Sequence, residues 1–425
     1  MLLWVGFYGN RMTVKLNLMT HNPQKINNII NKMALLYAFC LPLSRAGLVF
    51  TSASLVILWI VEGGFKEKIA ILKQNTFVIS TLLLTSYMLL SFLWSDAING
   101  EGLYHFKRLW YYTVIFVFIT SLRQELIPRM MGVFLSAMLI SEILSYGIFF
   151  ELWTLRHGSP ADPTPFMNHL SYSLFLCATA ALLVVKFLLE KESLRLKIIY
   201  GVFFISSTTN LFITDGRSGQ VAFIFVIAAL IIFNVKNKIK GLFMSILLLT
   251  TVFFIADSFS PSFHHRAMTG FSELSKFIEQ GQYRGSWGAR LEFWDVGLSA
   301  AKQEPILGVG IGDITANLKE GKANGQAIKH VPSGGYHSDL LETIVAGGLL
   351  GAILFMSIFF FLWKAKIKDP LVNNMRVIVT VIFICGLISD NFLRAQFTIV
   401  LFSFFVGIIF AQQRHEQTAV IQAKI

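Results

Sequence analysis

Charged residues are scarce in this chain of 425 residues. Asp, Glu, Lys and Arg together make up only 14% of the sequence, whereas hydrophobic residues make up 55%. A soluble domain carries roughly 25% charged residues, so this composition excludes an ordinary soluble enzyme. The hydrophobic residues form continuous runs rather than the alternating ten-residue segments of a membrane β-barrel. We therefore expect an all-α integral membrane protein.

Cysteine is also scarce, and the sequence lacks the usual metal-binding motifs. Cys40, Cys177 and Cys385 all fall within apolar runs, so they predict neither a disulfide framework nor a ligand cluster. The absence of any Asp-x-Asp pair argues against a metal-dependent nucleotide-sugar transferase. His264 and His265 are adjacent but have no third ligand at helical spacing. We expect no metal and no cofactor.

The formal net charge of +12 does not indicate a nucleic-acid-binding protein, because the basic residues do not form one patch. They fall in short clusters between the apolar runs, which is typical of a multi-pass membrane protein with basic cytoplasmic loops. Such clusters also contact anionic lipid headgroups. The predicted partners therefore include membrane lipids and exclude nucleic acid.

Twelve apolar runs predict membrane-spanning helices, since a bilayer core of about 30 Å needs roughly 20 apolar residues per helix. The runs lie at residues 26–44, 46–61, 76–94, 109–121, 127–150, 169–189, 197–213, 219–235, 241–256, 337–363, 375–389 and 395–412. The predicted parts of the chain are an N-terminal tail at 1–25, nine spans within 26–256, one large loop at 257–336, three spans within 337–412 and a C-terminal tail at 413–425.

The loops between these runs predict the orientation in the membrane. One alternate set is rich in Lys and Arg, as in residues 236–240, whereas the other set carries isolated arginines such as Arg156 and Arg217. The positive-inside rule makes the basic set cytoplasmic. Both tails are then cytoplasmic, and the loop 257–336 faces the other side of the membrane.

The loop 257–336 is expected to contain amphipathic helices, one of them over residues 290–303. Apolar residues recur at roughly helical spacing from Leu291 to Ala301, with charged residues between them. A helix of this kind lies at the membrane surface. Pro305 is expected to end it, and the glycines that follow predict a flexible turn.

Isolated arginines on the outer side are the first candidates for a functional site, because the positive-inside rule disfavours them there. Arg217 lies in a short turn at 214–219, where the free amides of the following helix would add to an anion site. Arg290 opens the amphipathic helix with Arg284 nearby, and a guanidinium offers paired donors to phosphate. The alternatives are a snorkelling Arg217 paired with Asp215 and a solvated loop face that contacts lipid phosphates.

His337 is the candidate general base. It stands at the start of an apolar run, directly before Ser338 and Asp339, and imidazole is the group that most often moves protons near neutral pH. The alternative is a helix cap or an interface residue. Arg156 and His169 flank a loop rich in proline and are candidates for lining the same cavity, with packing roles as the alternative.

Two stretches resemble motifs of bacterial O-antigen ligases. His337-Ser338, followed by nine residues, Gly348, two residues and Gly351, is similar to the His-[Asn/Ser/Gln]-x9-Gly-x-x-Gly motif of these ligases. Residues 290–294, Arg-Leu-Glu-Phe-Trp, and 304–310, Glu-Pro-Ile-Leu-Gly-Val-Gly, resemble a stretch that O-antigen ligases and polymerases share. The turn at 214–219 and the pair Trp94-Ser95 are similar to two shorter stretches, and the His motif favours ligase over polymerase.

The resemblance implies a GT-C-like glycosyltransferase with its active site on the periplasmic side of a Gram-negative inner membrane. It implies metal-independent, inverting transfer of a glycan from undecaprenyl diphosphate to a sugar hydroxyl of lipid A-core, in lipopolysaccharide biosynthesis. Arg217 and Arg290 would bind the diphosphate, and His337 would take the acceptor proton with Asp339 as its orienting partner. The candidates for supporting roles are Arg284, Arg156 and His169.

Three alternatives remain at this stage. An O-antigen or capsule polymerase would use the same donor with a growing chain as acceptor, and a protein O-oligosaccharyltransferase would use a Ser or Tyr hydroxyl. A secondary transporter or flippase would also have about twelve spans, but it predicts related halves and ionisable groups near the membrane midplane. In this sequence the polar candidates gather at one face.

Overall fold

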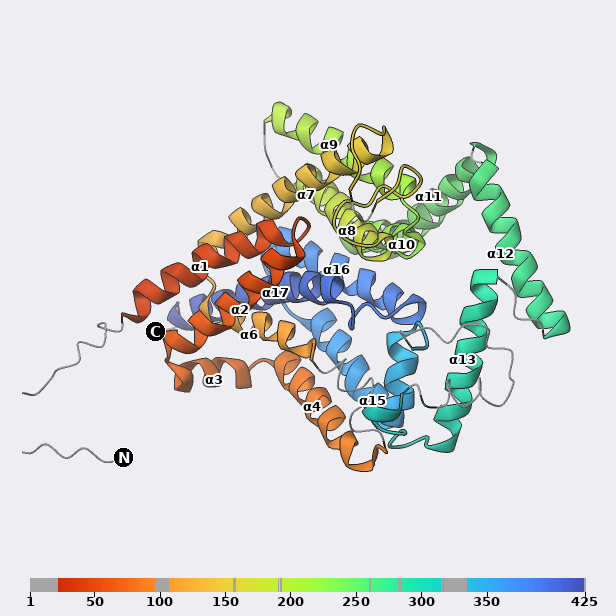
Figure 1. Cartoon of the computed structure of the whole chain (residues 1–425). Coiled ribbons are helices and arrows are strands. Elements are labelled where there is room, and N and C mark those ends of the chain that lie inside the picture. Colours follow the sequence, from red (N-terminus) through yellow and green to blue (C-terminus); the bar gives the residue numbers. More distant parts are fainter. Residues whose placement is uncertain are drawn as a thin grey trace, which may run out of the picture.

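The computed structural model describes residues 22–96, 107–155, 158–189, 191, 193–259, 261–281, 285–314, 316 and 335–423. Within these ranges the chain is helical (Figure 1), and the only extended pairing is an isolated bridge between Ser159 and Asp162. The all-helical prediction is therefore confirmed for the described part of the chain.

The helices occur in the following order along the chain: α1 (Pro23–Cys40), α2 (Arg45–Glu62), α3 (Phe65–Lys73), α4 (Thr76–Leu90), η1 (Ser91–Trp94), η2 (Leu109–Tyr112), α6 (Thr113–Ser121), η3 (Gln124–Leu126), α7 (Ile127–Phe149), α8 (His169–Leu189), α9 (Leu194–Ile213), α10 (Arg217–Asn234), α11 (Lys238–Phe259), α12 (Pro261–Gln280), α13 (Gly285–Gln303), η4 (Ile311–Asp313), α15 (Asp339–Lys364), α16 (Pro370–Ser389) and α17 (Gln396–Gln422).

Nine helices of the described ranges are long and apolar enough to cross a membrane. They are α2, α4 with η1, α7 with η3, α8, α9, α10, α15, α16 and α17. The other three predicted runs coincide with α1, with the shorter apolar helix Leu109–Ser121 and with α11. Twelve spans therefore stays a prediction, and so does the side of the membrane on which the segment 257–336 lies.

Helix α17 forms the centre of the bundle (Figure 1), and 83% of its most apolar window is buried. It packs against α6, α8 and α16. Its phenylalanines contact aromatic rings of the neighbouring helices. Measured between ring centroids, Phe402 lies 4.8 Å from Phe383 of α16, and Phe404 lies 5.6 Å from Phe134 of α7. A helix that is apolar on every side belongs in the interior of a bundle.

Side-chain caps mark several helix starts at positions where the apolar runs begin. Asn75 accepts from the amides of Phe77 and Val78 at the start of α4, and Asp369 accepts from Val372 at the start of α16. Such caps satisfy amides that have no partner within the helix. The first apolar run differs from its predicted length, because α1 ends at Cys40 and a turn precedes α2.

Two α-helices, α12 and α13, lie in the described part of the segment between α11 and α15. Amphipathic helices were predicted in this segment, but only one of them was placed, at residues 290–303. The predicted helix 290–303 is the C-terminal part of α13, which begins at Gly285 and ends at Gln303 as expected. The additional helix α12 carries the clearer apolar stripe, formed by the exposed side chains of Met268, Phe271, Leu274 and Ile278.

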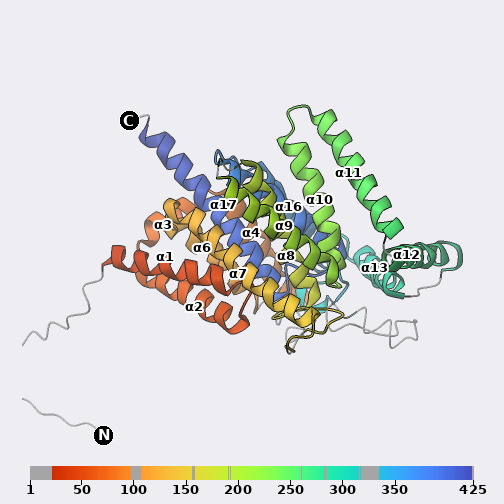
Figure 2. The same cartoon turned by 90° about the horizontal axis from the view of Figure 1, so that it is seen from above.

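The helix ends lie at two edges of the bundle. In Figure 2 the C-terminal end of α17 and the α10–α11 connection lie at one edge, and the loop that precedes α8 lies at the opposite edge. Helices α12 and α13 extend to one side of the bundle, away from α1 and α2 (Figures 1 and 2).

Candidate active site at the start of α15

Helix α15 is broken at Gly348, where the backbone has φ 58° and ψ −157°. The segment 305–310 crosses the helix at this break and forms backbone hydrogen bonds with it on both sides. The amide nitrogen of Val309 donates to Val345 O at 2.9 Å, that of Gly310 to Ala346 O at 3.0 Å, and that of Leu349 to Pro305 O at 2.8 Å. The crossing segment thus satisfies backbone groups that the break would leave unpaired.

Glycine is required where the two segments cross. At Gly308, which has φ 71°, an added Cβ would lie 2.5 Å from the amide nitrogen of Gly347, and at Gly348 it would lie 2.3 Å from the carbonyl carbon of Ile306. Positive φ is also unfavourable for residues that carry a Cβ. The prediction of a flexible turn after Pro305 is therefore wrong, because this turn is bonded to α15.

Residues from the end of α4 to Ser95 form hydrogen bonds with the same crossing. Trp94 Nε1 donates to Gly308 O at 3.1 Å, and Ser95 Oγ accepts from the amide of Gly312 at 3.1 Å. Tyr87 OH donates to Gly347 O at 2.8 Å. The Trp94-Ser95 pair, the 304–310 stretch and the His337 motif, which are distant in sequence, therefore meet at one place.

His337 stands directly before α15 in an uncommon conformation. Its φ is 51°, in the left-handed region that side-chain-bearing residues rarely adopt. The imidazole stacks on Phe293 of α13, with centroids 5.9 Å apart and an interplanar angle of 25°. Its Nδ1 lies 3.3 Å from Asp390 Oδ1, and 32% of its side chain is exposed. The ring is thus held on two sides and still accessible.

Asp390 is the site residue that the sequence analysis missed. Asp339 was expected to orient His337, but its Oδ2 accepts from the amide of Leu393 at 2.8 Å and its Oδ1 lies 3.9 Å from Arg394 Nε. The carboxylate beside the imidazole belongs to Asp390 at the end of α16. Its only sequence signal is a short polar stretch, 389–391, between two apolar runs.

A buried charge cluster fixes the α16–α17 loop to the start of α15. Arg394 forms an ion pair with Glu342, whose side chain is fully buried. Glu342 Oε1 also accepts from Asn391 Nδ2 at 2.6 Å and from the amide of Tyr336 at 2.9 Å. Removing one partner of a buried ion pair lowers the free energy of unfolding by about 3–5 kcal/mol. The cluster therefore fixes the position of Asp390 relative to His337.

Helix α13 brings Arg290 towards His337. At Gly297 the helix lies so close to the start of α15 that a Cβ would lie 2.9 Å from the Tyr336 ring and 2.8 Å from Leu341. Arg290 is partly exposed and lies one turn before Phe293, so both side chains project from the same side of α13. The other predicted arginine of this region, Arg284, lies outside the described residues.

Three buried polar atoms of residues in this region have no hydrogen-bond partner in the part of the chain that the structure describes: Trp294 Nε1, Tyr336 OH and Asp390 Oδ2. Buried polar atoms are normally paired, so these atoms are candidates for contacts with a ligand. Burial, followed by the Glu342 carboxylate, raises the pKa of the Tyr336 phenol well above its usual range, and the hydroxyl therefore remains a neutral donor. Among the described residues no group of three His, Cys, Asp or Glu side chains is placed to hold a metal ion.

The predicted turn at 214–219 packs against the start of α8. Added Cβ atoms at Gly216 and Gly219 would lie 2.3 Å and 2.4 Å from Ser173 Cβ. Arg217 begins α10 with an exposed side chain, and no side chain caps this helix. The amide of Arg217 donates to Asp215 O at 2.9 Å, and the amide of Gly219 donates to Gly216 O at 3.1 Å. The exposed group at the start of α10 is therefore the side chain of Arg217.

Asp162 joins His169 to the same turn. Its Oδ2 lies 2.9 Å from His169 Nδ1, and its Oδ1 accepts from the amide of Asp215 at 3.2 Å. Arg156 lies outside the described residues. Helix α16 packs against both α8 and α10, and it ends beside Asp390, so one helix connects the Arg217 turn with the His337 site.

One curated relative shares part of the chain. The sequence is 24% identical over 208 residues to an uncharacterised protein of Haemophilus influenzae. The alignment covers 48% of this chain and 52% of that protein, so the chain spans about half the length of this relative.

A family model matches the middle part of the chain. Residues 201–356 match the O-antigen ligase family. The matched segment begins in α9 and ends in α15, and it therefore contains Arg217, Arg290, the crossing at 305–310 and His337. Over this segment the chain is similar to the O-antigen ligase family.

Proposed function

We propose that this protein is an O-antigen ligase that transfers a glycan from undecaprenyl diphosphate to a sugar hydroxyl of lipid A-core. The reaction would take place on the periplasmic face of the inner membrane, with both termini in the cytoplasm. The observation that carries the proposal is the geometry of His337, which is accessible, stacked on Phe293 and bonded to Asp390 within the family-matched segment.

In the proposed reaction His337 is the general base. Its Nδ1–H donates to Asp390, which leaves Nε2 free to take the proton of the acceptor hydroxyl. The acceptor oxygen then attacks the anomeric carbon, the bond from this carbon to the diphosphate breaks, and its electron pair leaves with the diphosphate. Direct displacement inverts the anomeric centre. The Asp390 carboxylate stabilises the imidazolium that forms, as the carboxylate does in a catalytic triad.

The leaving diphosphate requires positive charge, and Arg290 and Arg217 are the proposed sources. Arg290 lies one helical turn from the residue that stacks on His337, and Arg217 has an exposed side chain at the start of α10. Helix N-termini and guanidinium groups both favour phosphate oxygens. A donor that stabilises developing charge contributes about 10²–10³ in rate.

The polar atoms without partners are proposed to recognise sugar. Trp294 Nε1 and Tyr336 OH are donors beside His337, and sugar hydroxyls are good acceptors. Aromatic rings with a polar group at one edge suit a ligand that has both apolar and polar faces.

The test is ligation with purified full-length protein, undecaprenyl-diphosphate-linked glycan and lipid A-core in the presence of a chelator. His337→Ala, Arg290→Ala and Arg217→Ala are compared with wild type, and Arg195→Ala, an exposed arginine of α9, is the control. We expect chelator-resistant ligation that each of the three variants lowers by about a hundredfold or more and the control leaves unchanged.

The product distinguishes the alternatives. Extension of the donor into longer lipid-linked chains would identify a polymerase, and transfer to Ser or Tyr of a protein would identify an O-oligosaccharyltransferase. Wild-type ligation by His337→Ala would refute the proposed base.

A further inference from the structure

A second polar region lies at the other end of α15. The helix has 26 residues, so at a rise of 1.5 Å per residue its two segments together run for about 39 Å. There a cavity of about 1130 Å³ lies between the α3–α4 connection, the end of α15, the start of α16 and the C-terminal part of α17. In the proposed orientation this is the cytoplasmic end.

The charged side chains that line this cavity are mostly basic. The cations are Lys364, Lys366, Lys368, Arg376 and Arg414, and the only carboxylate in the lining is Glu416. Glu416 is already engaged, because its oxygens accept from the amides of Lys368 at 2.7 Å and Asp369 at 3.0 Å, just before α16. The cavity therefore has a strong excess of positive charge.

Arg376 is fixed in position without a carboxylate partner. Its Nε and Nη2 donate to Asn373 Oδ1 at 3.1 Å and 2.9 Å, and Nη1 donates to Trp363 O. Its guanidinium lies 5.3 Å from the centre of the Trp363 ring, and only 6% of the residue is exposed. All of these partners are neutral, so they orient the guanidinium without cancelling its charge.

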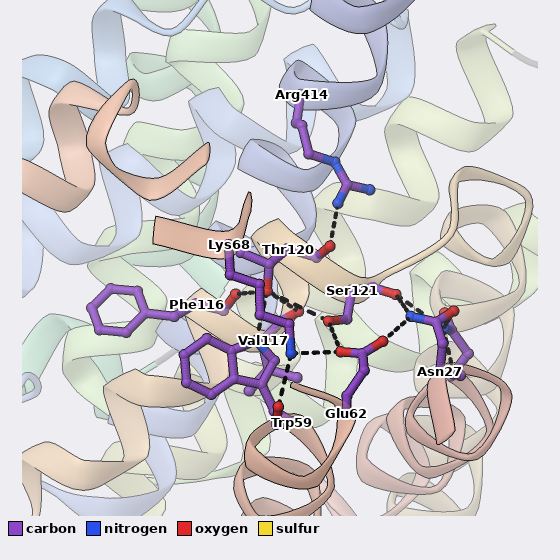
Figure 3. Close-up of polar contacts among 10 residues, drawn as sticks. Asn27, Trp59, Glu62, Lys68, Phe116, Val117, Thr120, Ser121 and Arg414 are labelled. Carbon is purple, nitrogen blue, oxygen red and sulfur yellow. Dashed lines mark hydrogen bonds and ion pairs between the residues drawn. The ribbon is translucent and has the colours of Figure 1, made fainter. Parts of the chain in front are cut away.

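Arg414 is held in a similar way from α17. Its Nη1 donates to Thr120 O at 2.6 Å and its Nη2 to Leu122 O at 2.8 Å. Figure 3 shows this arginine above the buried pair of Glu62 and Lys68. Glu62 Oε2 lies 2.7 Å from Lys68 Nζ and also accepts from Ser121 Oγ at 2.7 Å. The Glu62 carboxylate therefore pairs with Lys68. Within the described part of the chain, Arg414 contacts the carbonyl oxygens of Thr120 and Leu122 and its neighbour His415.

We infer that this cavity binds the phosphate group of an anionic phospholipid. The positive-inside rule accounts for basic residues in cytoplasmic loops, but it requires neither a shared cavity nor two pre-positioned arginines. Buried charges are normally paired. Arg376 is buried and Arg414 is half-buried, and neither forms an ion pair with a carboxylate among the described residues. A phosphodiester supplies the missing anion, and basic pockets between helices on this side of a membrane suit lipid headgroups.

The apolar part of the lining favours a lipid over a free phosphate ion. Ile71, Ile119, Phe410 and Ile421 also line the cavity, and the exposed Phe360 and Trp363 lie on α15 beside it. These apolar side chains would not stabilise a bound phosphate ion. The glycerol and upper acyl carbons of a lipid would cover them and remove apolar surface from water, which is favourable. The inference rests on this cavity alone and is independent of the proposed glycan transfer.

The experiment compares lipid binding by the full-length protein in a neutral detergent, using native mass spectrometry. The probes are phosphatidylglycerol, phosphatidylcholine and, as a competitor, inorganic phosphate. The variant K366Q/K368Q removes two exposed lysines of the cavity. The matched control K191Q/R195Q removes two exposed cations from the α8–α9 connection and its neighbouring turn, outside the cavity.

We expect wild type to retain phosphatidylglycerol in preference to phosphatidylcholine. K366Q/K368Q should weaken phosphatidylglycerol binding by about 25-fold, which corresponds to about 2 kcal/mol at about 1 kcal/mol per cation, and K191Q/R195Q should leave it unchanged. If inorganic phosphate displaces phosphatidylglycerol and its own binding is weakened by K366Q/K368Q, the cavity binds phosphate. Its occupant would then be a phosphate ion from the water and not a lipid. Equal losses in both variants, or no binding of either anionic probe, would overturn the inference.

Discussion

The Nδ1 atom of His337 lies 3.3 Å from Oδ1 of Asp390, although 53 residues separate the two in the chain. The contact exists because α15 and α16 are antiparallel neighbours, so the start of one helix meets the end of the other. The buried Arg394–Glu342 pair then fixes the loop that carries Asp390. This arrangement supports the proposal that the imidazole acts as a general base, and it leads to four predictions.

The first prediction concerns Asp390. Asp390→Asn keeps the shape but removes the charge that stabilises the imidazolium, so kcat for ligation should fall by about a hundredfold or more. The KM for the donor should change little, because Asp390 holds His337 and not the diphosphate. Steady-state kinetics separates the two parameters. Asp369→Asn, a cap at the opposite end of α16 that asparagine can also form, is the control, and an Asp390→Asn enzyme with wild-type kcat would contradict this role.

The second prediction concerns the break in α15. Gly348→Ala would place a methyl group 2.3 Å from the carbonyl carbon of Ile306 at a positive φ, so we expect a loss of stability of at least about 2 kcal/mol. Thermal unfolding in detergent measures the change. Gly132→Ala in α7 is the matched control, because its Cβ would meet nothing within 4 Å and alanine favours a helix. Equal melting temperatures for the two variants would show that the crossing does not constrain α15.

The third prediction concerns the buried ion pair. Arg394→Leu and Glu342→Leu should each destabilise the protein by about 3–5 kcal/mol, because each removes one partner of a buried ion pair. The double variant should lose clearly less than the sum of the two. A double-mutant cycle on unfolding free energies measures this coupling, and simple additivity would mean that the two side chains act independently.

The fourth prediction concerns Arg290. Arg290→Lys keeps the positive charge but loses the paired donors of the guanidinium, so the proposed diphosphate role predicts about a tenfold or greater loss of kcat/KM for the lipid-linked donor. Lys302→Arg, the reverse exchange near the end of the same helix, should have no effect. If Arg290→Lys were as active as wild type, charge alone would suffice at this position and paired binding of the diphosphate would be excluded.

The apolar runs were predictable from the sequence because the hydrophobic requirement of a membrane span is local. Every predicted run coincides with a helix, and the end of α13 at Gln303 follows from Pro305 shortly beyond it. The second helix of the 257–336 segment was not placed because no cap or periodic pattern was assigned there, although Met268, Phe271, Leu274 and Ile278 recur at helical spacing. Arg217, Arg290 and His337 were identified as candidates because charged or titratable residues are conspicuous against an apolar background.

By itself, then, the sequence determined the helical class, the approximate helix positions and a short set of candidate side chains, since each depends on neighbours along the chain. Which of these side chains lie close together was decided only by the tertiary structure. Asp390 replaced Asp339 as the partner of His337 because the distance depends on how α16 packs against α15, and no local pattern encodes that contact. The glycines after Pro305 became a bonded crossing instead of a flexible turn for the same reason: their partners lie about 40 residues away, across the break at Gly348.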